Sequence, residues 1–306
     1  MKTRLTAFLL PLFVALSLAQ ISYPPASFFK FLGINVKGNT AIYKGARVSI
    51  ELLGGRLYKV HYQGPVNNYD AAADVLAAAV GDVGIKKPFV DWIVKNKDKI
   101  AAAKKPLTVG VERAFFLVIK DGKGLVFDVV PYEVPTQAFA DKGHILGKKG
   151  VIIREYSDFQ CPYCKMFFEK TLPEIKKRYI DTGKARFEFN HFPLTEIHKE
   201  SLNAAVASNC AGEQGKFWEF HDQVFKNGAG DYDEKAASLG LNVKKFDSCR
   251  QQTSVREGVL AQRQEAVNLG LNGTPSVFVG PFLLPNAFDV DAYARYIEMA
   301  AALNEK

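Results

Sequence analysis

The chain has 306 residues, of which 48% are hydrophobic and 24% are charged, an ordinary globular composition with room for two domains. Its formal net charge is +8. The basic residues are scattered among acidic ones and form no aromatic and basic stripe or known nucleic-acid-binding motif, so the charge does not indicate nucleic acid as a partner.

The first 19 residues have the pattern of a secretory signal. Lys2 and Arg4 precede an apolar run at positions 5–18, and Ser17-Leu18-Ala19, with a small residue at each end, supplies a cleavage site. The apolar run has about 14 residues, fewer than the roughly 20 that a spanning helix needs. We therefore predict a signal peptide at residues 1–19 and a periplasmic, cell-envelope or secreted protein. The alternative is an uncleaved N-terminal anchor.

Residues 20–134 are predicted to form a small α+β domain of unknown role. Apolar residues alternate with polar ones on both sides of Gly54-Gly55, which indicates two strands joined by a tight turn. An alanine-rich helix, a second helix and a second hairpin follow. The predicted helices are 69–80 and 88–103, and the strands of the second hairpin are 109–119 and 125–130. This region contains no cysteine and no cluster typical of a catalytic site.

Residues 135–143 are predicted to be a linker to a second domain, residues 144–306. In this domain a short β-branched strand leads into a Cys-x-x-Cys motif and a helix, and a second strand completes a βαβ unit. The predicted elements are strands at 151–153 and 185–192, a helical block at 196–269, a strand at 276–279 with a hairpin partner, and a helix at 290–302. A βαβ half and a ββα half with helices inserted between them form a thioredoxin-like α/β fold.

The motif Cys161-Pro162-Tyr163-Cys164 has what a disulfide exchanger needs, one thiol that ionises near neutral pH and a second within its reach. At the start of a helix, the Cys161 thiolate would be stabilised by unpaired backbone N–H groups and the helix dipole. Pro162 suits the first helical position, where its missing N–H is not needed. Cys164 lies one turn later, and we expect it to be the more buried, resolving thiol.

Two structural roles compete with catalysis for this motif. Half of a zinc site would require a second close pair of ligands, but Cys210 and Cys249 are 39 positions apart and have no paired histidine, so we predict no metal. A structural disulfide is the stronger alternative, because exported proteins accumulate such bridges. Gly273-Thr274-Pro275 weighs against it, since a proline directly before an apolar strand is well placed for a cis peptide bond.

Three segments resemble bacterial DsbA-like proteins of the thioredoxin superfamily: EYSDFQCPYC at 155–164, NCAGEQGKFWEFHD at 209–222 and GTP at 273–275. The resemblance covers residues 143–306. It implies a thiol–disulfide oxidoreductase without a cofactor, in which Pro275 is cis and faces the cysteine pair. It also implies substrate binding by the backbone at Thr274, and a buried carboxyl at Glu155 that assists proton movement.

The chain departs from the family pattern inside the motif. Strongly oxidising members commonly have histidine where this chain has Tyr163, which should leave the Cys161 thiolate less stabilised. The predicted substrate contacts are Thr274, Pro162 and Tyr163. Asp158, three residues before Cys161, is expected to be exposed.

The remaining cysteines and the aromatic residues of this half are expected to be structural. Cys210 and Cys249 fall in the helical insertion and are predicted to form a structural disulfide, with two free buried thiols as the alternative. Aromatic residues between positions 217 and 225 have the spacing of the core side of an amphipathic helix. No partner residue is evident for His191 or His198.

The leading hypothesis is an exported enzyme that introduces disulfides into envelope or secreted proteins through Cys161 and Cys164. Its partners would be unfolded or partly folded proteins with cysteines, and a membrane redox partner that reoxidises the pair. One alternative is a dimeric isomerase or reductase, in which the N-terminal domain joins two chains. The other is a binding or adaptor protein whose disulfides are structural.

Overall fold

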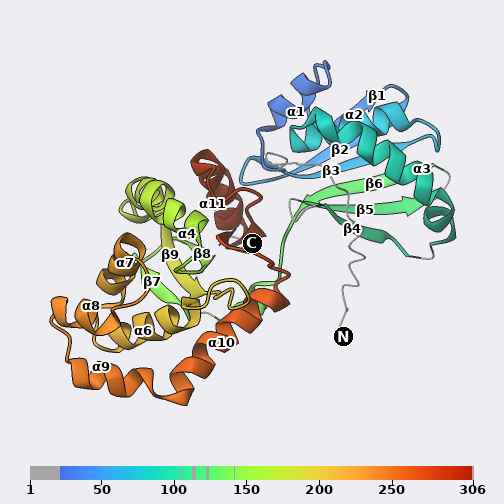
Figure 1. Cartoon of the computed structure of the whole chain (residues 1–306). Helices are drawn as coiled ribbons and strands as arrows, with labels where there is room; N and C mark the ends of the chain where they lie inside the picture. Colours follow the sequence, from blue (N-terminus) through green and yellow to red (C-terminus); the bar gives the residue numbers. More distant parts are fainter. Residues whose placement is uncertain (1–20, 104, 112–114, 122–123, 141, 305–306) are drawn as a thin grey trace. The chain divides into compact units, whose positions relative to one another are not determined.

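A computed structural model describes residues 21–103, 105–111, 115–121, 124–140 and 142–304 (Figure 1). Contacts divide the chain into two units. The first unit ends at Glu133 and resumes at Phe282, and the second unit is Val134–Pro281. The predicted signal peptide lies outside the described residues. Within those residues, no helix combines the length and the apolar character that crossing a membrane requires.

The first unit contains a six-stranded antiparallel sheet with strand order β1-β2-β3-β6-β5-β4. Its register pairs Ile50 with Val60 and Tyr62 with Phe127, and since alternate residues share a face, these side chains form one apolar face. The strands are β1 (Thr40–Tyr43), β2 (Ala46–Leu53), β3 (Arg56–Gly64), β4 (Leu107–Val111), β5 (Phe115–Asp121) and β6 (Leu125–Pro131).

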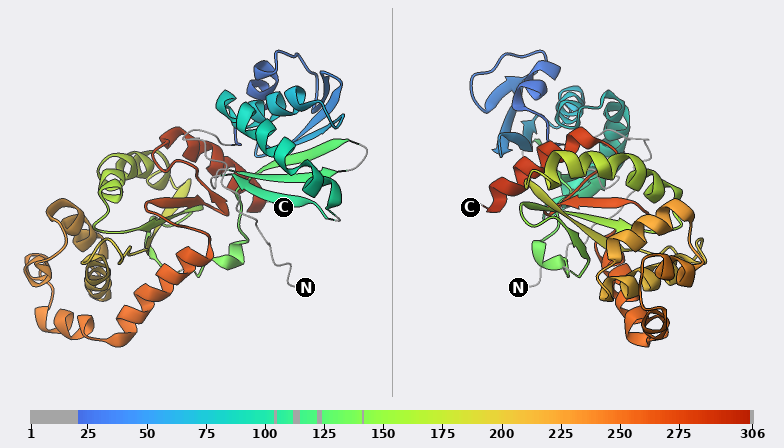
Figure 2. Two further views of the ribbon diagram at one scale, coloured as in Figure 1. Left: turned by 45° about the vertical axis from the view of Figure 1, so that its right-hand side comes forward. Right: turned by 90° about the vertical axis from the view of Figure 1, so that its left-hand side faces the viewer.

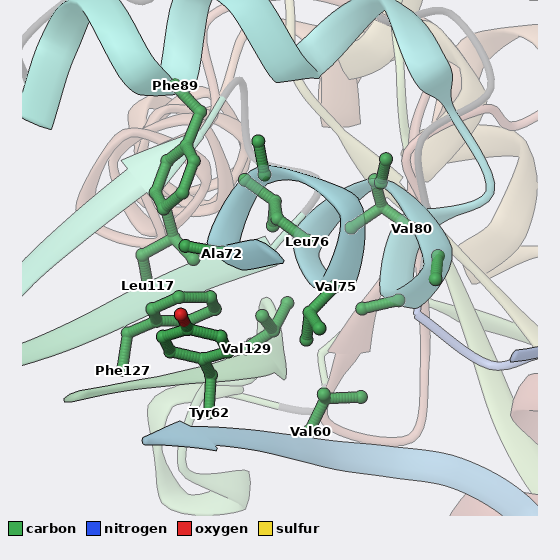
Figure 3. Packing of buried hydrophobic residues seen from close by; sticks show 14 of the residues in the cluster. Val60, Tyr62, Ala72, Val75, Leu76, Val80, Phe89, Leu117, Phe127 and Val129 are labelled. Carbon is green, nitrogen blue, oxygen red and sulfur yellow. The ribbon is translucent and has the colours of Figure 1, made fainter. Parts of the chain in front are cut away.

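Two helices cover the apolar face of this sheet (Figures 1 and 3). The helix α2 (Tyr69–Val80) is alanine-rich and buries nine residues, because small side chains let a helix approach a sheet closely. It ends at Gly81, which has the left-handed conformation. From α3 (Lys86–Ala102), Phe89 packs edge-on against Phe127, with ring centroids 5.4 Å apart. A short helix, α1 (Pro25–Phe31), contributes Phe28 and Phe29 to the same core.

The predicted strand at 109–119 is two strands, β4 and β5, that pair antiparallel with each other. The prediction of one strand was wrong because nothing in the sequence marks the reversal. Positions 112–114 are Glu-Arg-Ala, without glycine, proline, asparagine or aspartate. The other predicted hairpin, between β2 and β3, and the helix at 69–80 agree with the structure.

The second unit is built on the strands β10, β8, β9 and β7, in that order across the sheet. Strands β8 and β9 are parallel, and β10 and β7 pair antiparallel with β8 and β9, respectively. The strands are β7 (His144–Leu146), β8 (Val151–Ser157), β9 (Ala185–His191) and β10 (Ser276–Val279). The predicted βαβ unit is therefore present, and its strands are buried almost throughout.

Helices lie on both sides of these strands, with the helix that follows the cysteine motif on one side and α10 on the other (Figure 2). The first begins as α4 (Pro162–Met166) and continues through π-helical turns and α5 (Leu172–Ile175) to Ile180. The insertion consists of α6 (Ser201–Glu213), α7 (Phe217–Asn227), α8 (Tyr232–Ser238), α9 (Val243–Arg250) and α10 (Thr253–Asn268). A disulfide joins Cys210 of α6 to Cys249 of α9.

The grouping of contacts differs from the predicted boundaries at both ends of the second unit. The predicted linker, 135–143, belongs to this unit, because its backbone N–H groups bind carboxylates there. Ala140 donates to Glu265 Oε2 at 3.0 Å, and Gly143 donates to Glu188 Oε1 at 2.8 Å.

At the other end, β11 (Phe282–Leu283) and α11 (Val290–Asn304) group with the first unit. Helix α11 packs against β2 and β3, and Arg295 donates to Ser22 Oγ at 3.2 Å. These contacts connect segments at opposite ends of the chain, and the sequence pattern contains no signal for them.

Candidate active site

The cysteine pair stands where β8 ends and α4 begins. Cys161 is the N-cap residue, with extended backbone angles, and its carbonyl accepts the backbone N–H of Lys165 at 3.1 Å. Pro162 occupies the first helical position, where no N–H is required. Cys161 is 5% exposed and Cys164 is fully buried, and both are free thiols. Cys161 therefore keeps a small exposed surface, while Cys164 has none.

Strand pairing brings a distant loop to Cys161. The antiparallel register of β8 and β10 pairs Tyr156 with Ser276, so the residues before β10 lie beside the turn that leads to Cys161. The peptide bond between Thr274 and Pro275 is cis. Cys161 Sγ lies 3.4 Å from the Thr274 carbonyl oxygen, to which the protonated thiol donates, although the two residues are 113 positions apart.

The surroundings of Cys161 favour its thiolate. A hydrogen bond from the Cys164 thiol lowers the pKa of Cys161 most, and the Thr274 hydroxyl lowers it further. The backbone N–H groups at the start of α4 act in the same direction. Burial opposes them, and the net effect lowers the pKa of Cys161 to about 5. At neutral pH, Cys161 is therefore a nucleophilic thiolate.

The groups behind Cys161 are kept protonated. Burial, followed by the hydrogen bond to Cys161 and the charge of Glu155, raises the pKa of Cys164 well above that of an ordinary thiol. Glu155 is 2% exposed, and burial raises its pKa to about 8. A neutral carboxyl and a neutral thiol thus lie together behind one ionised sulfur.

Asp158 is buried, which corrects the expectation that it is exposed. Its carboxylate accepts the backbone N–H groups of Gln160 and Leu194, both at 2.7 Å, and contacts His198 Nδ1 at 2.9 Å. The bond to Gln160, two residues on, is a turn that aspartate commonly forms and that sequence could have indicated. The partners from positions 194–198 come from tertiary structure alone.

The histidines also have partners that the sequence did not reveal. The Nε2 atoms of His144 and His191 lie 2.7 and 2.8 Å from Asn209 Oδ1. Burial lowers the pKa of His191 to about 3, so this ring is neutral at physiological pH. Phe217, Phe220 and Phe225 of α7 are buried in the core as predicted, with the Phe225 ring 5.0 Å from that of Phe159, whereas Trp218 is only partly buried. Across the described residues, no three His, Cys, Asp or Glu side chains are grouped to hold a metal.

A family model described as thioredoxin matches residues 140–299, which is more than half of the chain. The chain belongs to the thioredoxin family. The predicted DsbA-like resemblance and the thioredoxin-like fold class are confirmed by this match and by related proteins. A probable disulfide bond formation protein D from Bacillus cereus is 31% identical, over 47% of this chain and 73% of that protein.

Two other proteins similar to this thioredoxin-family chain are a much longer protein and a solved structure of lower sequence identity. An Na⁺/H⁺ antiporter NhaA 3 from Salinispora tropica is 27% identical over 76% of this chain, and the chain spans only 33% of that antiporter. The crystal structure of oxidised BdbD from Bacillus subtilis is 23% identical, with a TM-score of 0.48, over 56% of this chain and 96% of that one.

Replacing Thr274 with valine is expected to raise the pH at which Cys161 becomes reactive. The substitution removes the hydroxyl that lowers the pKa of Cys161 and keeps a similar shape. A hydrogen bond to a charged group contributes about 1.5 kcal/mol, so the midpoint for alkylation of Cys161 by iodoacetamide should rise by about one pH unit. Thr274→Ser is the matched control, because it keeps the hydroxyl. An unchanged midpoint in Thr274→Val would show that this hydroxyl does not stabilise the thiolate.

Proposed function

We propose that this protein is a thiol oxidase that donates the Cys161–Cys164 disulfide to other proteins. A substrate thiolate attacks Cys161 Sγ of the oxidised pair, forms a mixed disulfide, and releases Cys164. A second substrate thiol then attacks the substrate sulfur, so that the substrate leaves oxidised and the cysteine pair leaves reduced. The observation that carries this proposal is the pairing of an ionised, reachable Cys161 with a buried, protonated Cys164.

The same observation supports the direction of transfer. A thiolate at Cys161 exists only in the reduced protein, so every interaction that stabilises it favours the reduced state. A pair whose reduced form is stabilised is an oxidant toward ordinary thiols. Tyr163 does not supply the positive ring that histidine supplies at this position in strong oxidants, and the Cys164 thiol and the Thr274 hydroxyl, which both lower the pKa of Cys161, act in its place.

The substrate and the location follow from the motif and the N-terminus. The substrates would be unfolded or partly folded proteins with cysteines, meeting the protein at Pro162, Tyr163, Thr274 and Pro275. Tyr163 is 61% exposed and so is free to contact them. The secretory pattern at residues 1–19 supports export to the periplasm or envelope, where disulfides persist, and a membrane redox partner would restore the oxidised pair.

The test is transfer to a defined substrate. Oxidised protein is mixed with reduced, unfolded ribonuclease A, and free substrate thiols are counted over time. We expect one disulfide in the substrate for each pair reduced. Retention of all substrate thiols would contradict the proposal. Rescue of scrambled ribonuclease by reduced protein, together with a dimer in sedimentation, would favour the isomerase alternative instead.

A further inference from the structure

The proton of Cys164 has no direct route to solvent. Cys164 is fully buried, yet it must lose its proton to attack Cys161 and regain it when a substrate opens the disulfide. The backbone N–H of Asp158 donates to Cys164 Sγ at 3.5 Å, so the sulfur is held against the end of β8. The group that exchanges the proton must therefore come from this strand or lie next to it.

Two side chains of β8 face this region from the same side of the strand. Residues alternate between faces, so Glu155 and Ser157 project together while Tyr156 projects from the opposite face. Ser157 is 1% exposed, and Glu155 is almost as fully buried. Glu155 is the expected proton acceptor, but Ser157 was given no role by its position in the sequence.

Both side chains carry a buried oxygen that lacks a partner. Among the described residues, neither Ser157 Oγ nor Glu155 Oε1 makes a hydrogen bond of ordinary geometry. A buried, unpaired polar atom is costly, and one at a reactive centre calls for a functional explanation. The Ser157 hydroxyl is close enough to lower the pKa of both Glu155 and Cys164. It thus acts on both ends of the path that the proton must take.

We propose that the Ser157 hydroxyl relays the proton between the Cys164 thiol and the Glu155 carboxyl, an inference that rests on the proposed function. When Cys164 resolves a mixed disulfide, its S–H bond breaks and the proton passes to Ser157 Oγ, while the Ser157 proton passes to the Glu155 carboxylate. The Cys164 sulfur bonds to Cys161 Sγ and is oxidised. The bond from Cys161 to the partner sulfur breaks, and the partner leaves as a reduced thiolate. The path runs backward when a substrate thiolate opens the disulfide.

The charge on Cys161 differs between the redox states, and it changes how readily Glu155 accepts a proton. Burial raises the pKa of Glu155 most, and the Cys161 thiolate raises it further by repulsion, so in the reduced protein Glu155 keeps its proton. In a mixed disulfide, Cys161 carries no charge, and Glu155 ionises more readily and can accept the proton of Cys164. The charge of Cys161 acts on both Glu155 and Cys164, and the charge of Glu155 acts on Cys164, while the Ser157 hydroxyl lowers the pKa of both Glu155 and Cys164.

The experiment follows a single step that needs no protein substrate. The reduced full chain is mixed rapidly with an excess of oxidised glutathione, which forms the mixed disulfide at Cys161, and the release of glutathione from it by Cys164 is followed between pH 6 and 9. Ser157→Ala is expected to slow release by about 10-fold to 100-fold near neutral pH, the range of general acid–base catalysis. Ser157→Thr, which keeps a hydroxyl, should restore the rate, and Ser208→Ala, a buried serine elsewhere in the unit, should not change it.

Two further measurements separate a relay from a structural effect. In mixtures of H₂O and D₂O, the wild-type rate should depend on deuterium fraction along a curve, since two protons move together, whereas Ser157→Ala should lose that curvature. The double variant Ser157→Ala/Glu155→Gln should be no slower than the slower single variant, because both act on one path. A wild-type rate in Ser157→Ala at every pH, or a linear dependence on deuterium in the wild type, would overturn the relay.

The deuterium measurement uses the wild type alone, so it decides the matter even if Ser157→Ala does not fold. Failure of the wild type to oxidise ribonuclease would refute the proposed function and leave the glutathione result standing. A normal glutathione result in Ser157→Ala would refute only the relay. The two failures are thus distinguishable.

Discussion

Cys161→Ala is expected to lower disulfide transfer to reduced ribonuclease by at least about three orders of magnitude, to the background rate of air oxidation. The substitution removes the one sulfur of the pair that a substrate can reach, and the remaining Cys164 is fully buried and protonated. The measurement is the rate of loss of substrate thiols under conditions in which the wild type completes transfer.

Cys164→Ser tests the other half of the same mechanism. It keeps the Cys161 nucleophile but removes the resolving thiol, so a mixed disulfide with glutathione should form at Cys161 and persist. Mass spectrometry should find one adduct that dithiothreitol removes. Ser208→Ala is the control for a buried substitution in the same unit. Transfer by Cys161→Ala at the wild-type rate, or an adduct on Cys161→Ala equal to that on Cys164→Ser, would contradict the assigned roles.

Removing the disulfide between Cys210 and Cys249 is expected to lower the free energy of unfolding of the second unit by about 4 kcal/mol. The bridge closes a loop with a sequence separation of 39, and the chain-entropy model gives this magnitude. Alanine at both positions suits their burial between α6 and α9. The loss is measured by urea denaturation.

The chain offers a local probe for this measurement. Its two tryptophans lie in different units, Trp92 in α3 and Trp218 in α7. In a Trp92→Phe background, fluorescence therefore reports on the second unit. Alanine at Cys161 and Cys164 prevents exchange with the catalytic pair. Dithiothreitol should then destabilise the protein with Cys210 and Cys249 intact and have no effect on the protein without them. Equal stability of the two proteins without reductant would contradict a stabilising bridge.

Local sequence was a sufficient guide where a structure depends on neighbouring residues. The hairpin at Gly54-Gly55, the helix at 69–80 and the strand at 276–279 agree with the structure, because each depends on periodicity and a turn signal within a few residues. The strand predicted at 109–119 failed for the same reason, since its reversal carries no turn residue.

At the site, too, some features depend on neighbouring residues and others on distant ones. The Cys-x-x-Cys spacing and Pro162 at the first helical position are enough to place a reachable sulfur at a helix start with a second sulfur one turn behind it. Chemistry at these sulfurs depends on burial and on partners from other strands and loops. The register of β8 and β10 brings Thr274 to Cys161, and the turn at Asp158 is tied to Leu194.

A pKa measures the difference in free energy between two charge states, and that difference is set by all the groups around the atom, whatever their position in the chain. The reacting pair could be predicted from the Cys-x-x-Cys spacing taken together with the distant Gly273-Thr274-Pro275. Which of the two thiols ionises follows partly from its place at the helix start. That Glu155 stays neutral, and that the Ser157 hydroxyl lowers the pKa of both Glu155 and Cys164, follow only from the burial of β8 in the tertiary structure.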